Sequence, residues 1–457
     1  MRELDVVIVG GGMVGASLAL ALAGTGLETM VIEGVLPGLG AQPSFDDRTT
    51  ALGNASRRIF QGLGVWSAMA PEAAAIRTIH VSDAGRFGFA RLNASEQGVD
   101  AFGYVVTNRV IGRALWSRLA DAKGITVRAP AQAQSVQLGP DFARLTVTDA
   151  GGANPEVIST RLIVAADGAH SSVRAAAGIE ATVEDYGQVA ITANVATDRA
   201  PDGTAYERFT QSGPLALLPL HDGSYGLVWS VEPAEATRLL ALSEKTFAEE
   251  LQSRFGWRAG RFTRIGRRSS YPLKLTRAST LVAQRAVLIG NAAQALHPVA
   301  GQGFNLGLRD AAMLAELLAG AANRNPQPAD SGSTPSAWAT QKRTDSASDE
   351  MPGAAGAATT EGPNSLPQTS SGARPDPGSA ELLARFEAWR SGDRGGVIRF
   401  TDGLIRLFGD TRPSMGLARN FGLLLFDLMP PAKSALARVS AGFAGPSPRL
   451  ARGLPLR

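Results

Sequence analysis

The stretch Ala286–Ala312, A-V-L-I-G-N-A-A-Q-A-L-H-P-V-A-G-Q-G-F-N-L-G-L-R-D-A-A, decides the fold of this chain. It opens with an apolar run, Val287–Ile289, which is typical of a buried strand. A glycine-rich loop over residues 290–303 follows, and from Phe304 the apolar spacing becomes helical. Glycines where a loop meets a helix start let backbone N–H groups approach an electron-rich ligand, and the helix N-terminus adds about half a positive charge. The stretch therefore predicts a strand, a ligand-binding loop and a helix.

A second glycine motif lies at the N-terminus. Leu4–Val9 is predicted to be a buried parallel strand, and Gly10-Gly11-Gly12-Met13-Val14-Gly15 fits G-x-G-x-x-G. A helix over Ala16–Gly24 and a strand over Thr29–Ile32 are expected next, and Glu33 follows that strand. The order of strand, glycines, helix, strand and acid predicts a dinucleotide-binding unit. The alternative is a structural turn without a nucleotide.

Each glycine in this motif has a separate physical role. Gly10 makes the turn, Gly12 lets a pyrophosphate approach the backbone, and Gly15 lets helix and strand pack closely. The Glu33 carboxylate can accept hydrogen bonds from ribose hydroxyls.

A third segment begins where another apolar run ends. Leu162–Ala166 is predicted to be a buried strand and leads into Asp167-Gly168-Ala169-His170-Ser171-Ser172-Val173-Arg174. We expect Ser171 and Arg174 to hold this turn and the short helix after it.

Together the three segments resemble the aromatic-ring flavoprotein monooxygenases, the p-hydroxybenzoate-hydroxylase-like group. Most members have Gly-Asp at the start of the long stretch, whereas this chain has Gly290-Asn291, followed by Gln294 where His is common. That departure resembles the ubiquinone-biosynthesis branch, most of all the 2-polyprenyl-6-methoxyphenol hydroxylases. The resemblance implies an α/β fold: a Rossmann-like FAD-binding domain with a parallel sheet, an antiparallel-sheet substrate domain and a C-terminal helical segment.

The resemblance also implies one bound FAD, with NAD(P)H as a transient co-substrate, since no second complete glycine unit is present. Its implied cofactor residues are Gly10, Gly12, Gly15, Glu33, Arg48, Arg109, Asp167, Gly168, Asn291, Pro298, Gly301, Gly303 and Asn305. Within the loop, Pro298, Gly301, Gln302 and Gly303 would position the flavin ring. Asn291 would bond the ribityl chain, where the family usually has Asp. For Arg48 and Arg109 the alternative stays open that each is a solvated arginine without a cofactor contact. The sequence identifies no general base.

The activity implied by the resemblance is hydroxylation of a polyprenylated methoxyphenol in ubiquinone biosynthesis. Reduced flavin would take O2 to form a C4a-hydroperoxide, which hydroxylates the phenol to a hydroquinone. Two alternatives stay open. One is a flavin monooxygenase of a soluble aromatic compound in another pathway, and the other is a non-catalytic FAD-binding subunit of a biosynthetic complex. A complex of ubiquinone-biosynthesis proteins is also an expected partner.

The pattern of apolar runs and turns predicts a discontinuous domain organisation. The FAD-binding domain is expected over residues 1–75, 103–185 and 281–322, and the substrate-binding sheet domain over 76–102 and 186–280. Residues 323–380 are rich in Pro, Ser, Thr, Gly and Ala, which predicts a disordered low-complexity insertion. Residues 381–457 are expected to form the C-terminal helical segment.

Several local elements follow from periodicity and turn residues. A helix is expected over Ala51–Leu63, and short strands over Ile79–Ser82 and Arg86–Ala90. Phe247, Leu251 and Phe255 recur at helical spacing and are predicted to face the core. An antiparallel ribbon is expected from three alternating runs, Ile125–Val127, Ala133–Leu138 and Arg144–Thr148.

Bulk composition excludes several function classes. The 457 residues carry a formal net charge of +4 and no compact Lys/Arg run, so nucleic acid is not an expected partner. Cysteine is absent, and the four histidines show no ligand spacing, so we expect no metal site. Val6–Ala23 is apolar, but its glycines and its acidic flanks argue against a membrane span or a signal segment. A cytoplasmic location is therefore expected.

One apolar stretch near the C-terminus has two open interpretations. Phe421–Met429 is too short to span a bilayer. In the first, the stretch packs on the flavin domain. In the second, it lies on a membrane near the entrance for a lipid substrate, and the protein is peripheral on the inner membrane.

Overall fold

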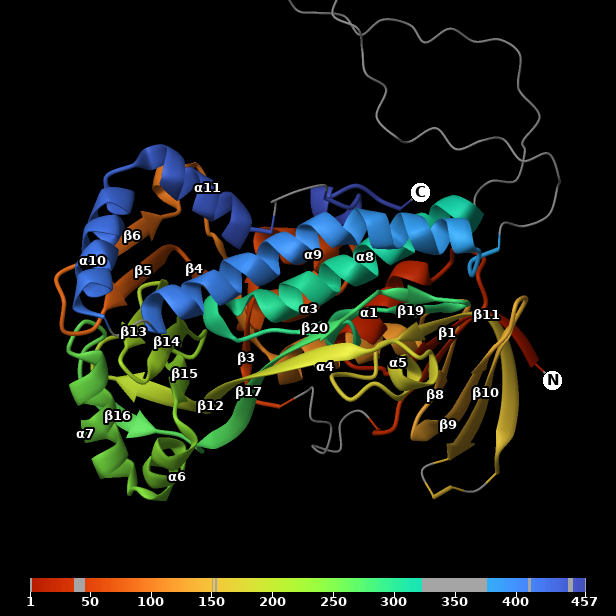
Figure 1. The fold of residues 1–457 in the computed structure, drawn as a ribbon, viewed down its shortest axis with the longest axis horizontal. Helices are drawn as coiled ribbons and strands as arrows, with labels where there is room; N and C mark the ends of the chain where they lie inside the picture. The colour runs from red at the N-terminus through yellow and green to blue at the C-terminus, as the bar shows by residue number, and fades with distance from the viewer. Residues whose placement is uncertain are drawn as a thin grey trace, which may run out of the picture.

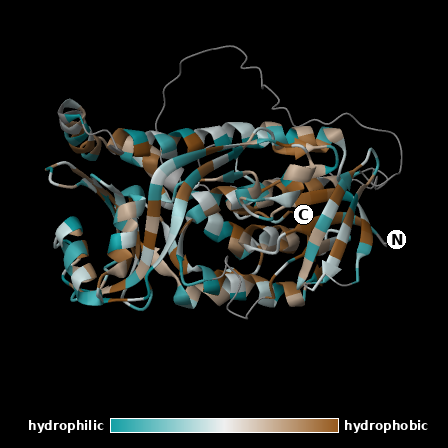
Figure 2. Ribbon diagram, turned by 60° about the horizontal axis from the view of Figure 1, so that its bottom comes forward, coloured by the Kyte–Doolittle hydropathy of each residue, from teal (hydrophilic) through white to brown (hydrophobic). Residues whose placement is uncertain are grey.

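The computed structural model describes residues 2–36, 46–149, 151–152, 154–322, 376–409, 412–442 and 447–456. Two large sheets are joined by long strands, and two long helices lie side by side across both of them (Figure 1). Apolar segments gather in the half of the molecule that holds the N-terminus (Figure 2).

The first sheet contains the predicted parallel core. Its order is β18-β19-β11-β1-β2-β8, and the pairs from β19 through β8 are all parallel. Two further strands, β9 and β10, extend it as an antiparallel ribbon from β11. The strands are β1 Arg2–Val9, β2 Thr29–Ile32, β8 Ile125–Arg128, β9 Ala131–Leu138, β10 Ala143–Asp149, β11 Glu156–Ala165, β18 Val282–Ala283 and β19 Ala286–Leu288. The central strands are buried on both faces, which matches their unbroken apolar runs.

Helices cover this sheet. Helix α1 (Met13–Leu22) packs against α4 (Asn108–Ala120) and α8 (Gln302–Ala322), and α8 lies beside α9 (Ala380–Gly409) (Figure 1). From Gly15 onward every residue of α1 is buried. Its small residues bring it close to the sheet and to α8.

The second sheet confirms the predicted antiparallel layer. Its order is β20-β17-β12-β15-β14-β13-β5-β6, with β16 paired to β12, and only the β13–β5 pair is parallel among its described strands. Its strands are β5 Thr78–Asp83, β6 Phe89–Asn93, β12 Ala181–Thr197, β13 Thr204–Thr210, β14 Gly213–Pro219, β15 Tyr225–Val231, β16 Phe262–Ile265, β17 Ser269–Ala278 and β20 Gln294–Ala295. Helices α6 (Pro233–Ala241) and α7 (Glu244–Phe255) pack on it. The predicted core stripe of α7, Phe247, Leu251 and Phe255, is buried.

A small third sheet corrects the predicted helix over Ala51–Leu63. Residues Thr49–Gly53 form β3, which pairs with β7 (Gly103–Thr107), and β4 (Ala74–Ile76) pairs with the same strand. The helix α2 begins only at Asn54 and ends at Gly62. The preceding threonines favour a strand once β7 offers them a ladder of hydrogen bonds. A single turn, α3 (Trp66–Met69), follows.

Two other strand predictions were wrong in detail. Residues 125–128 do not join the antiparallel ribbon, because β8 pairs in parallel with β2. Partner choice is set by tertiary packing, which an alternating pattern does not encode. The strand predicted at Arg86–Ala90 is displaced to Phe89–Asn93. A turn takes the earlier residues, with Gly85 at a φ of +73° and the Arg86 N–H donating to the Asp83 carbonyl.

The C-terminal segment is helical, as predicted. Helices α10 (Pro413–Asp427) and α11 (Pro430–Ser440) follow α9. Most of the predicted insertion, residues 323–375, lies outside the described residues, while Asp376 pairs with Arg285 just before α9 begins. None of the described helices combines the length and the apolar character that a membrane crossing requires.

Candidate active site

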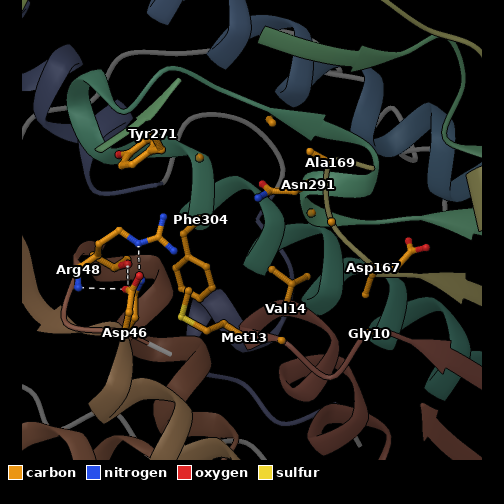
Figure 3. Close-up of a pocket in the computed structure, with 18 of the residues that line it drawn as sticks. Gly10, Met13, Val14, Asp46, Arg48, Asp167, Ala169, Tyr271, Asn291 and Phe304 are labelled. Atoms are coloured by element: carbon orange, nitrogen blue, oxygen red, sulfur yellow. Dashed lines mark hydrogen bonds and ion pairs between the residues drawn. The ribbon is translucent and has the colours of Figure 1, made fainter. Parts of the chain in front are cut away.

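The three sequence motifs meet around one large cavity between the two sheets. Its volume is about 1260 Å³. Pockets for drug-sized ligands measure about 300–1,000 Å³, so this cavity has room for a dinucleotide together with an aromatic ring. The turn after β1, the turn after β11 and the start of α8 line one side (Figure 3). Strands β12, β15 and β17 of the second sheet line the other.

The first glycine turn leaves no space for side chains. Gly10 has a φ of +101°, and a Cβ added there would lie 2.4 Å from the Ala166 carbonyl oxygen. A Cβ on Gly15 would lie 1.9 Å from the Gly10 oxygen. Gly12 is the N-cap of α1, has no side-chain cap, and lines the cavity with Gly10. The free backbone N–H groups at this helix start suit a phosphate.

The second glycine motif packs directly on the first. Gly290 has a φ of +59°, and a Cβ added there would lie 3.2 Å from the Val14 side chain. A Cβ on Gly307 would lie 2.9 Å from the Gly290 Cα. Helix α8 can therefore press its N-terminal turn, with Gly303 and Phe304, against the cavity.

Glu33 closes one end of the cavity. Its Oε2 accepts a hydrogen bond of 2.6 Å from the Gly11 N–H, and its Oε1 accepts one of 3.0 Å from the Val35 N–H. The carboxylate lines the cavity next to the glycine turn. It is thus held where a ribose bound at the start of α1 would lie.

Asp167 presents a spare acceptor. Its Oδ2 accepts from the Ser172 N–H at 2.8 Å and so binds the start of α5 (Ser172–Ala176). Its Oδ1 is buried and has no hydrogen-bond partner among the described residues. Both Asp167 and Gly168 line the cavity. A buried acceptor without a donor is costly, so a ligand hydroxyl fits here.

Ser171 and Arg174 hold this turn, as predicted. The Ser171 Oγ accepts from the Arg174 N–H at 3.0 Å. The Arg174 guanidinium donates to the Ala169 carbonyl at 2.8 Å and to the Ala292 carbonyl at 2.9 Å. The second of these bonds ties the turn after β11 to η3 (Gly290–Ala292), the short helix that carries Asn291.

Two arginines expected at the cofactor lie in different settings. Arg48 lines the cavity, where its Nε donates to Asp46 at 2.6 Å and its guanidinium lies 5.5 Å from the centre of the Tyr271 ring (Figure 3). Arg109 pairs with Asp47 at 3.1 Å, is more than half exposed and is not among the lining residues. Asn108, the residue before it, lines the cavity.

The remaining predicted residues divide into two groups. Asn291 and Gly303 line the cavity, whereas Gly15, Pro298, Gly301, Gln302 and Asn305 do not. The Asn305 side chain makes its hydrogen bonds to other groups of the protein. Its Nδ2 donates to the carbonyls of Ala51 and Gly301, both at 2.8 Å, and its Oδ1 accepts from the Ser56 hydroxyl at 2.6 Å. Asn305 therefore fixes the loop to β3 and α2.

His297 is buried within the same loop. Its Nδ1 accepts from the Val299 N–H at 3.1 Å, and its Nε2 lies 3.4 Å from the Gln188 Oε1. Burial lowers the pKa of this imidazole to about 4. The loop therefore contains a neutral histidine at physiological pH. Among the described residues, no group of histidines and carboxylates is arranged to hold a metal ion.

Sequence reasoning missed the ionic cluster behind this loop. Asp310 Oδ2 accepts from the Gly290 N–H at 3.0 Å and from Gln294 Nε2 at 2.8 Å. Its Oδ1 accepts from Arg390 of α9 at 2.6 Å. Arg390 also pairs with Asp393, which pairs with Arg309 at 3.1 Å. An R-D dipeptide in α8 and an R-x-x-D in α9 were visible, but nothing local marks them as buried.

Comparison with known proteins gives a consistent result. The family model for the FAD binding domain matches residues 3–331. The chain is 34% identical over 458 residues to the ubiquinone hydroxylase UbiL of Rhodospirillum rubrum, covering all of this chain and 94% of that protein. It is 34% identical over 325 residues to the 3-demethoxyubiquinol 3-hydroxylase of Escherichia coli K12, covering 70% of this chain and 81% of that one.

A solved structure shows the same fold. The p-nitrophenol 4-monooxygenase PnpA from Pseudomonas putida DLL-E4 superposes with a TM-score of 0.72 at 16% identity, covering 97% of this chain and 99% of that one. The predicted fold class is confirmed by this likeness and by the two sheets described above.

Proposed function

The chain belongs to the FAD binding domain family and, within it, to the ubiquinone hydroxylases, and from this premise we propose that it hydroxylates a polyprenylated phenol of ubiquinone biosynthesis. FAD, reduced by NAD(P)H and then reacting with O2, supplies the oxygen-transfer chemistry when bound. The observation that carries the proposal is the large cavity between the two sheets. It joins both glycine turns to the second sheet, in a chain similar to a ubiquinone hydroxylase over its whole length.

In this proposal each end of the cavity has its own task. The backbone at Gly10 and Gly12 binds the pyrophosphate, and Glu33 accepts from the ribose. The Asp167 Oδ1 would accept a hydrogen bond from a hydroxyl of the cofactor's linking chain, which would give this buried oxygen a donor. Asn291 binds the same chain.

The other end orients the aromatic ring. The start of α8, which lines the cavity, would hold the flavin ring and stabilise negative charge on it, because the N-terminus of a helix carries about half a positive charge. Leu227, Pro272 and Phe304 exclude water from the ring, while Arg48 and Tyr271 close the side opposite Asn291 (Figure 3). Contacts with the membrane and with other proteins of the pathway belong to the same proposal, because the substrate is a lipid.

Turnover with two kinds of phenol tests this function. We expect a prenylated methoxyphenol to stimulate NAD(P)H oxidation and to gain one oxygen atom, detected by mass spectrometry. A soluble phenol such as p-nitrophenol should do neither. Hydroxylation of the soluble phenol alone would favour a monooxygenase of another pathway, and NAD(P)H oxidation that no phenol stimulates would favour a non-catalytic subunit. Complementation of strains blocked at single ring-hydroxylation steps then identifies the position.

A glycine substitution tests the cofactor site. Gly10→Ala should abolish FAD retention, because its Cβ would lie 2.4 Å from the Ala166 oxygen. Gly26→Ala is the matched control, since Gly26 has a similar φ of +87° but no atom within 4 Å of an added Cβ. Flavin absorbance per mole of purified protein measures both. Equal flavin content in the two variants would contradict the assignment of the first turn.

A further inference from the structure

One face of helix α10 exposes a row of large apolar side chains to solvent. Phe421, Leu424, Leu425 and Leu428 follow one another at helical spacing and are all exposed, Leu428 by 73%. Single exposed apolar residues are ordinary, but a contiguous apolar face marks a binding surface.

The opposite side of α10 is held by polar contacts. Asn420 is buried, and its Oδ1 accepts from the Gly88 N–H at 2.6 Å. Asp427 accepts from the Arg91 N–H at 2.8 Å and pairs with Lys433 at 2.9 Å. These bonds fix α10 on β6, so its rotation is set by the protein and its apolar face is turned outward.

The apolar face continues onto the second sheet domain. The Phe87 ring lies 6.0 Å from the Phe421 ring, edge to face. Phe87 and Trp257, both more than half exposed, line a groove of about 560 Å³ with Asn420. In Figure 1 α10, β5, β6 and α7 all lie at the end of the molecule opposite the N-terminus.

The same groove is cationic. Arg86, Arg208 and Arg258 line it, and none of the described residues that line it carries a carboxylate. Asp83 is buried and already lies 3.6 Å from Arg86 and 3.5 Å from Arg419. Burial first, and then the charge of Arg258, lower the pKa of Arg208, and the carboxylate of Asp83 offsets them only in part. An anion bound there would relieve this repulsion.

We propose that this surface, defined by Phe87, Trp257, Phe421, Leu425, Leu428 and the groove arginines, docks the protein on an anionic lipid bilayer. Aromatic rings beside arginines, next to a short apolar helix face, suit the boundary between headgroups and acyl chains. The arginines bind lipid phosphates and the α10 face enters the acyl region. The inference develops the membrane contact proposed above, and it rests on the proposed function only for its biological purpose.

Vesicle flotation tests the surface with the full-length protein. The wild type should float with phosphatidylcholine vesicles that contain phosphatidylglycerol, and less with pure phosphatidylcholine. The double variant Phe421→Ser/Leu425→Ser should bind at least about tenfold more weakly to both. Arg258→Gln should lose roughly fivefold on the anionic vesicles and little on the neutral ones. Val183→Ser, which alters a residue of β12 exposed by 57%, is the matched control and should float as the wild type does.

Three outcomes would overturn the proposal. The wild type could fail to float with either vesicle, or the double variant could float as the wild type does. The third is that the wild type forms a dimer and binds no vesicles, and that the double variant is a monomer. This result would assign the face to a second copy of the chain. Turnover of a short-chain phenol in detergent should be equal in the wild type and the double variant, which shows that both are folded. Flotation without any hydroxylation would remove the proposed function and leave this surface standing.

Discussion

Two of the C-terminal helices, α9 and α10, depart in opposite ways from the usual pattern of apolar residues inside and charged residues outside. Helix α9 buries Arg390, which is fully inaccessible, and Arg394. Helix α10 exposes Phe421 and Leu425. In α9 each buried charge has partners inside the chain, whereas the apolar face of α10 stays exposed even where Phe421 meets Phe87, which is itself exposed. An unusual residue is thus explained by its partner, and an apolar face that stays exposed indicates a partner outside the chain.

The largest expected effect comes from removing a buried charge of α9. Arg390→Met would leave Asp310 buried without its cation, while Asp393 would keep only Arg309. We expect the free energy of unfolding to fall by about 3–5 kcal/mol, as for other broken buried pairs. Because Asp310 also holds the Gly290 N–H, flavin retention should fall as well.

The control for Arg390 lies on the same helix. Arg399 is exposed, so Arg399→Met should change the free energy of unfolding by less than about 0.5 kcal/mol. Urea unfolding followed by circular dichroism measures both variants. Equal losses would show that α9 is held by its apolar residues alone.

The next largest effect is expected from acid, which should destabilise the folded protein through buried His297. The pKa of His297 is lowered by burial to about 4, below its unfolded value of 6.5. Its contribution is fully present above pH 6.5 and is lost as the pH falls toward 4, because the unfolded chain then binds the proton first. The loss amounts to at most about 3 kcal/mol.

His297→Gln should flatten this dependence. Free energies of unfolding at pH 7.5 and pH 5 should differ less in the variant than in the wild type, since glutamine takes up no proton. Parallel pH profiles for the two proteins would exclude His297 as the source. His80 titrates in the same direction, its pKa lowered by burial and by Arg258 to about 4, and it remains in both proteins.

A smaller effect is expected where α10 meets β6. Asn420→Ala would leave the buried Gly88 N–H without an acceptor, at a cost of about 1–3 kcal/mol. We expect faster hydrogen exchange of the α10 amides and weaker vesicle binding, because the apolar face is no longer held in one orientation. Exchange that is unchanged would mean that Asp427 alone anchors the helix.

The smallest effect on stability is expected one residue further along. Phe421→Ser changes the exposed face of α10, so the free energy of unfolding should stay within about 0.5 kcal/mol of the wild type. Vesicle binding should nevertheless fall. A large loss of stability would show that Phe421 packs within the monomer, and the contrast between α9 and α10 would disappear.

Local sequence was enough to predict the parts of the fold that local physics determines. The motif at Gly10–Gly15, the parallel strands β1 and β2 and the stripe of α7 all follow from spacing alone. The choice of β2 as the partner of β8 did not, because an alternating strand is compatible with several neighbours. The predicted helix included residues 51–53, which form the end of β3 because β7 supplies their hydrogen bonds.

For the site, the sequence predicted the cavity-lining turns but not their support. Gly10, Glu33, Asp167 and Asn291 line the cavity, whereas Arg109 is not a lining residue and pairs with Asp47, which is one. Charged residues on helices normally face solvent, so the burial of Asp310 and Arg390 could not be inferred before α8 and α9 were seen together. Whether each of these residues binds FAD stays a prediction.

The placement of β11 between β1 and β19 has a consequence for biosynthesis. Val9 pairs with Ala165, and Ala165 pairs with Leu288, so β1 finds β2 early but its other edge meets β11 only after a long stretch has been made. At ribosomal speeds of 5–20 residues per second, β1 waits roughly 10–30 s for β11, and the sheet waits about as long again for β19. During that interval an apolar nascent strand needs a chaperone or a temporary companion, and slower translation would lengthen its exposure.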